Sequence, residues 1–163
     1  MRAAEIEVLA DVYAGAVRTL RLRNSLPFAE IEIPKGKHRR YAPVHAVALA
    51  AQKELGTFGV SPERAAMILR KNVDLLWRNW ETLICGYYKL LIINNQSTIA
   101  SAADSAQILA GASLAGARSM FAVDLADLMI SICIRGASKG VQLPNFNDRA
   151  GWWRVKGTEN ERV

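Results

Sequence analysis

The sequence has few of the side chains on which most active sites and metal sites depend. Its 163 residues include two histidines and two cysteines. Cys85 and Cys133 lie in separate apolar segments without the spacing of metal ligands, which predicts buried thiols in a reducing cytoplasm. The sequence shows no phosphate-binding loop and no nucleophile motif, and Asp124 and Asp127 have the spacing of a solvated helix face. We therefore expect no catalysis, no metal and no cofactor.

Long apolar runs are also missing. The most apolar stretch, residues 83–93, is too short to cross a bilayer and contains Lys89. The first residues show no apolar signal segment. With 51% hydrophobic and 22% charged residues, the chain has the composition of a protein with a packed core rather than a disordered one. We expect a cytoplasmic protein with no membrane partner.

Positive charge, by contrast, is concentrated in one segment, residues 18–41. This segment contains seven lysines and arginines and two acids, so its local charge is +5, whereas the whole chain carries +6. Such a concentration suits the phosphate backbone of duplex DNA. The cations are Arg18, Arg21, Arg23, Lys35, Lys37, Arg39 and Arg40.

Two different elements are predicted to carry these cations. A short helix over about residues 16–24 places the three arginines near one face. Residues 29–33 alternate with the period of a strand, and a Pro-Lys-Gly-Lys turn follows at 34–37. Residues 39–41 would return as the second strand of a β-hairpin.

The rest of the chain shows helical periodicity. It predicts helices over about residues 43–55 and 62–71, one from residue 73 to about 93, and a long one over about 103–135. The helix from residue 73 carries a heptad pattern, which is either intramolecular core or the seam of a homodimer. The heptad positions are Val73, Leu76, Trp80, Leu83, Tyr87 and Leu90. Aromatic residues of this segment are alternative candidates to line a pocket for an apolar effector, namely Trp77, Trp80, Tyr87 and Tyr88.

Three motifs occur in a characteristic order. They are Val17-Arg18-Thr19-Leu20-Arg21, the run Gly36-Lys37-His38-Arg39-Arg40-Tyr41, and Gly59-Val60-Ser61 followed by Ala66-x-Ile68-Leu69. In this order they resemble the recognition helix, the wing and the start of the fourth helix of the MerR family of bacterial regulators. The resemblance covers about residues 5–95. The chain departs from the family at Leu22, where an aromatic residue is usual, and in the turn before the recognition helix.

The resemblance implies a mostly α fold: an N-terminal winged helix-turn-helix with a small β-hairpin wing, followed by long C-terminal helices. It divides the chain into a DNA-binding domain (1–71), a helical dimerisation or effector region (72–138) and an irregular tail (139–163). The implied function is a sequence-specific transcriptional regulator that binds double-stranded DNA as a homodimer through its heptad. The expected DNA contacts are Arg18, Thr19, Arg21, Arg23, Lys35, Lys37, His38, Arg39, Arg40 and Tyr41.

Other interpretations remain open. A second helix-turn-helix fits residues 49–70, although it leaves the larger basic cluster unexplained. The small residues at 110–117 would suit a closely packed assembly, such as a helical oligomer with a DNA-binding head like the small subunits of phage DNA-packaging motors. A scaffold built on the amphipathic helices is a third interpretation. A dimer would favour the regulator, and a ring of about eight or more subunits would favour packaging.

Overall fold

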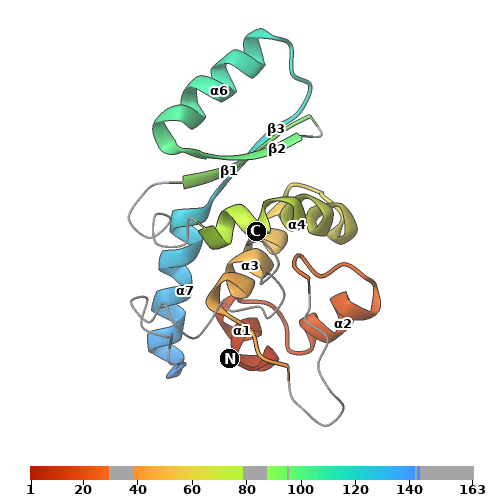
Figure 1. Ribbon diagram of the computed structural model, residues 1–163, viewed down its shortest axis with the longest axis vertical. Helices are drawn as coiled ribbons and strands as arrows, with labels where there is room; N and C mark the ends of the chain where they lie inside the picture. Colours follow the sequence, from red (N-terminus) through yellow and green to blue (C-terminus); the bar gives the residue numbers. More distant parts are fainter. Residues whose placement is uncertain (30–38, 79–87, 95, 142, 144–163) are drawn as a thin grey trace, which may run out of the picture.

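The computed structural model describes residues 1–29, 39–78, 88–94, 96–141 and 143. Four helices come first: α1 (Ala3–Leu9), α2 (Ala16–Leu22), α3 (Pro43–Thr57) and α4 (Pro62–Arg78). Then follow β1 (Tyr88–Ile93), β2 (Gln96–Ser101), α6 (Ala102–Leu114), β3 (Met120–Asp124) and α7 (Leu125–Lys139). Figure 1 shows α1 to α4 gathered at one end, the sheet and α6 at the other, and α7 running back along the helices.

Helix α3 is the centre of the helical end. Proline at its first position fixes the backbone angle that a helix start requires, and Pro62 does the same for α4. Most side chains of α3 are buried, and the helix contacts α1, α4 and α7. Because an α-helix that is apolar on most sides must be surrounded, α3 determines where its neighbours lie.

The sheet has the strand order β2-β1-β3, and both neighbours of β1 are antiparallel to it. Strand β1 is buried on both faces. Leu90 and Ile92 join the main hydrophobic core, whereas Leu91 points to the opposite face, over which α6 lies (Figure 1). Helix α6 connects β2 to β3 across β1, so these two edge strands run parallel to each other.

Helix α7 joins the sheet to the N-terminal helices. Its buried Leu125, Met129 and Ile132 belong to the same core cluster as Ile6 and Leu9 of α1. The Arg135 Nε donates a hydrogen bond to the Leu9 carbonyl over 2.7 Å. One continuous hydrophobic core therefore connects the helical end of the molecule with the sheet.

The predicted fold class is wrong in its C-terminal half. The heptad does not lie on one helix, because α4 ends at Arg78 and β1 begins at Tyr88. The predicted helix over 103–135 is two helices with β3 between them. Gly116 takes a left-handed conformation (φ 75°) just after α6, and Asp124 caps α7 by accepting from the Asp127 N–H over 3.1 Å. The described strands all lie in this half of the molecule.

The predicted wing falls mostly on residues 30–38, which lie outside the described residues. The predicted boundary between residues 71 and 72 stays a prediction, and α4 runs through it. Within the described part of the chain, no helix is long and apolar enough to cross a membrane.

Candidate nucleic-acid interface

The start of α2 is fixed by a carboxylate from α1. The Glu7 side chain is 6% exposed, and its two oxygens accept hydrogen bonds from the Gly15 N–H (3.1 Å) and the Val17 N–H (2.9 Å). Gly15 itself has φ +88°, a left-handed conformation that glycine adopts without strain. A carboxylate at this position satisfies helix-terminal N–H groups and stabilises the positive end of the helix dipole. Helix α2 is thereby held in a defined orientation on α1.

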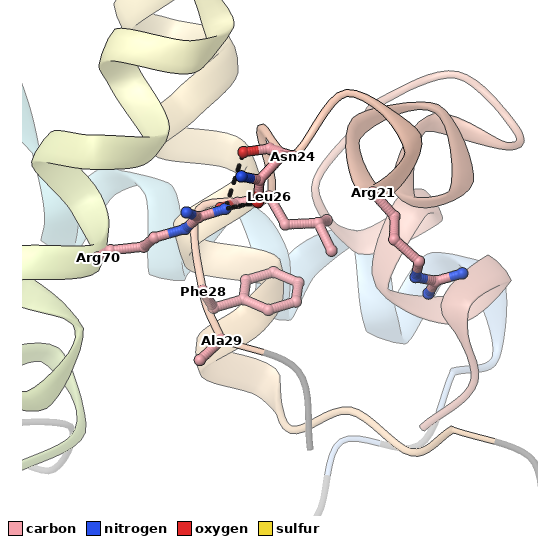
Figure 2. A pocket seen from close by; sticks show the side chains of 6 residues that line it. All are labelled: Arg21, Asn24, Leu26, Phe28, Ala29 and Arg70. Carbon is pink, nitrogen blue, oxygen red and sulfur yellow. Dashed lines mark hydrogen bonds between the residues drawn. The ribbon is translucent and has the colours of Figure 1, made fainter. Parts of the chain in front are cut away.

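The other end of α2 is held by α4. Asn24, just beyond the helix, has φ 53°, and the Ser25 N–H returns to the Leu20 carbonyl over 2.8 Å. Arg70 of α4 donates from Nε to the Leu26 carbonyl (2.7 Å) and from Nη2 to the Asn24 carbonyl (3.0 Å). Figure 2 shows this guanidinium reaching across to the turn. Both ends of α2 are therefore positioned by charged side chains of neighbouring helices.

One side of α2 packs against the protein and the other faces solvent. Ala16 and Val17 are buried, whereas Arg18 and Arg23 are exposed. Leu22 is 80% exposed. Of the three arginines that the sequence predicted on this helix, Arg18 is thus exposed on α2 and Arg23 is exposed just beyond its last residue.

Arg21 and Thr19 are turned to internal contacts. The Arg21 Nη2 donates to the Tyr41 hydroxyl over 2.8 Å, and the Thr19 hydroxyl donates to the Gly15 carbonyl over 3.1 Å. Tyr41 is 4% exposed, and its ring meets Phe28 and His45 edge-on, at centroid distances of 6.0 and 5.7 Å. Tyr41 is therefore a core residue that joins the segment from residue 39 to α2.

The bond between Arg21 and Tyr41 brings two basic segments together. Arg39 is half-buried and Arg40 is exposed, and both directly precede Tyr41. The remaining predicted contacts Lys35, Lys37 and His38 lie outside the described residues. Among the described residues, the candidate interface is the exposed face of α2 (Arg18 and Leu22), with Arg23 at its C-terminal end and the adjoining Arg39 and Arg40.

Glu63 of α4 lies close to this interface. Its pKa is lowered, first by a backbone hydrogen bond from its own N–H and then by the hydroxyls of Ser61 and Ser25 and the positive charge of Arg23. Its position at the start of α4 suits an acid. Because this carboxylate is held by α4 and Ser25, it borders the basic face without occupying it.

The described residues also contain a cavity of about 290 Å³ beside α2, shown in Figure 2. Its lining residues are Arg21, Asn24, Leu26, Phe28, Ala29 and Arg70. The Arg70 guanidinium is already bonded to backbone carbonyls, and the Arg21 guanidinium is bonded to the Tyr41 hydroxyl. The two cations therefore do not converge on a shared ligand position.

The predicted dimerisation residues fall in different elements. Val73 and Leu76 belong to α4, whereas Trp80, Leu83 and Tyr87 lie outside the described residues. Leu90 is 1% exposed in the middle of β1. Leu90 therefore contributes to the fold of one subunit rather than to a helical seam.

The alternative sites predicted from the sequence are divided between elements. In the second helix-turn-helix placement, Arg70 is bonded to the turn after α2, while Arg64 and Lys71 are exposed. Of the predicted effector pocket, Tyr88 is half-buried in β1, Trp77 belongs to α4, and the other two aromatics lie outside the described residues.

Cys133 is half-buried rather than fully buried, and burial raises the pKa of its thiol. No group of three potential metal ligands occurs among the residues that the structure describes.

The sequence did not indicate that Glu7 and Arg70 hold the two ends of α2, or that Leu22 lies on its exposed face. Glu7 follows Ile6 on a helix that packs into the core, and an acid at such a position indicates a buried polar contact, which is a usable signal. Arg70 has no comparable signal, since its partners are carbonyls of residues that are distant in sequence.

The sequence matches no protein-family model, and a search of curated proteins finds no match.

Proposed function

We propose that the protein binds double-stranded DNA through the exposed face of α2 and acts as a sequence-specific transcriptional regulator, a homodimer in the cytoplasm. The observation that carries the proposal is the exposure of Arg18 on α2, and of Arg23 at its C-terminal end, on a helix that is fixed at both ends. An exposed helix with cations on its outer face suits the major groove, and a fixed orientation is what reading base edges requires. The resemblance of residues 17–21 to a recognition helix supports the same function.

The arginines have distinct parts in this proposal. Arg18 lies on the outermost side of α2 and donates to a guanine edge, and Arg23 and Arg40 contact phosphates. Arg21 orients the helix through Tyr41 instead of reading bases. Two subunits related by a two-fold axis would recognise a palindromic site.

The first experiment selects bound duplexes from a random-sequence DNA library at near-physiological salt. We expect an enriched motif with two-fold symmetry. Arg18→Ala should then weaken binding to that motif by about 1–3 kcal/mol and relax the preference at one base pair of each half-site. Arg118→Ala is the matched control, because Arg118 is an exposed arginine in the loop before β3, at the far end of the molecule (Figure 1).

Equal DNA affinities of the Arg18 and Arg118 variants would show that α2 is not the interface. Binding without an enriched motif would contradict sequence-specific regulation.

A second candidate function is an assembly protein with a DNA-binding head. The exposed side of α6 favours it, because this helix presents small residues and Leu114, which is 91% exposed, and has Asp104 as its one charged residue. Small exposed residues permit close helix packing between subunits. Sedimentation of the full chain distinguishes the two functions, since a dimer fits the regulator and a larger ring fits the assembly protein.

A further inference from the structure

The exposed face of α2 contains one large apolar side chain among its cations. Leu22 is 80% exposed and lies four residues after Arg18, so both side chains project from the same side of the helix, one turn apart. Leu20 packs partly against the core, which shows that α2 already has an apolar side directed inward. Leu22 therefore adds little to the packing of the fold.

Other side chains of α2 are engaged within the protein. Thr19 donates to the Gly15 carbonyl, and Arg21 donates to Tyr41. The outermost line of the helix consists of Arg18 followed by Leu22. A helix that approaches DNA with this face brings a cation and an apolar group to the bases together.

Major-groove chemistry matches this pair of side chains. Guanine presents two acceptors that an arginine fork binds, and thymine presents the only methyl group, which favours apolar contact. One helical turn spans about 5.4 Å and successive base pairs are about 3.4 Å apart, so the two side chains reach base pairs one or two steps from each other.

We propose that Leu22 determines specificity by contacting the 5-methyl group of a thymine, one or two base pairs from the guanine bound by Arg18. The inference rests on the proposed function, because it requires α2 to enter the major groove. It extends that function by naming a chemical feature of the DNA, a pyrimidine methyl group, that a basic helix alone would not recognise.

The test removes single methyl groups from the DNA. Each thymine of the selected site is replaced in turn by deoxyuridine, which has the same base-pairing edge without the methyl. For the wild-type protein we expect one position in each half-site to weaken binding about three- to five-fold, the loss that corresponds to one buried methyl. Leu22→Ala should bind the thymine and deoxyuridine forms of that position equally well.

Leu114→Ala is the matched control, since it removes an even more exposed leucine from α6. This variant should keep the full preference for thymine over deoxyuridine. Leu22→Asn is a second variant, which keeps the size and branching of the side chain but not its apolar character, and it should also lose the preference. Circular dichroism of both Leu22 variants should match the wild type because the side chain is outside the core.

The outcomes separate the inference from the proposed function. Sequence-specific binding that no deoxyuridine weakens would overturn the role of Leu22 and leave the proposed function intact. A Leu22→Ala variant that keeps the preference for thymine would overturn the same role. Failure of the wild-type protein to bind any duplex would overturn both.

Discussion

The buried carboxylate of Glu7 shows how much a single residue contributes to the candidate interface. It belongs to α1 and accepts hydrogen bonds from two N–H groups at the start of α2. A seven-residue helix has little stability of its own, because its few hydrogen bonds do not offset the unfavourable free energy of helix nucleation. The orientation of the candidate interface therefore depends on this carboxylate.

Glu7→Ala should destabilise the protein by about 1–3 kcal/mol, since two N–H groups lose their acceptor. Chemical denaturation measures the loss. Glu7→Gln keeps one acceptor oxygen and should fall between the wild type and alanine. Glu5→Ala is the control, because Glu5 is on the same helix and accepts from the Arg2 N–H in an exposed position. An equal effect of the Glu5 and Glu7 variants would contradict the role of Glu7.

Asp11 forms an ion pair with Lys53. The Lys53 Nζ lies 2.6 Å from the Asp11 carboxylate and also donates to the Asp11 carbonyl over 2.8 Å. The hydrogen bond and charge of Lys53 lower the pKa of Asp11. Because this pKa is lower in the folded state, the associated stability is present at neutral pH and is lost as the pH falls through the folded-state pKa.

Lys53→Met should return the Asp11 pKa to its ordinary range, as measured by the carbon chemical shift of the carboxyl group during an acid titration. The same variant should also reduce the acid-dependent loss of stability. An unchanged Asp11 titration would show that Lys53 does not form this ion pair in solution.

At the scale of elements, the sequence predicts the N-terminal helices better than the C-terminal ones. Pro43 and Pro62 mark the helix starts that α3 and α4 have, since proline at a first helical position is a local signal. The run at residues 88–93 fits both a helix and a strand buried on two faces, and only its partners β2 and β3 decide between them. The spacing of Asp124 and Asp127 fits a solvated helix face as well as a helix start, and in the structure Asp124 is the N-terminal cap of α7.

The candidate interface was predictable in its charge but not in its arrangement. Arg18 and Arg23 are exposed, whereas Arg21, which the sequence placed near the same face, is not. The inward contact of Arg21 depends on where the fold places Tyr41, which lies twenty residues further along the chain. Charge clusters are local in the sequence, whereas the partner of a given arginine depends on tertiary structure.

Two helical glycines should respond oppositely to substitution. A Cβ at Gly111 of α6 would meet no atom within 4 Å, so Gly111→Ala should stabilise the protein by about 0.5–1 kcal/mol through helix propensity. A Cβ at Gly136 of α7 would lie 3.2 Å from Leu143 and 3.3 Å from Leu9. Gly136→Val should therefore destabilise by about 1–3 kcal/mol. Thermal unfolding measures both changes, and a stabilising Gly136→Val would contradict the close packing of α7 on α1.

At the scale of the whole molecule, the shared core predicts cooperative unfolding. Leu125, where β3 passes into α7, is fully buried and belongs to the cluster that contains α1 and α3. Leu125→Ala should cost about 2–5 kcal/mol and should accelerate amide hydrogen exchange in α1 and α3 as well as in the sheet. Leu114→Ala, which alters an exposed leucine, should leave amide hydrogen exchange unchanged in the helices α1 and α3 and in the sheet. Faster exchange confined to the sheet would show two independent units.

The contact between α7 and α1 also affects the order of events during synthesis. Arg135 bonds to a carbonyl that the ribosome made 126 residues earlier. At about 5–20 residues per second, α1 waits about 6–25 s before the helix that completes its surroundings has been made. During this interval the side chains of α1 that α7 will cover are exposed to water and to chaperones. Helix α1 therefore gains its contact with α7 only when a segment 126 residues further along the chain has been made.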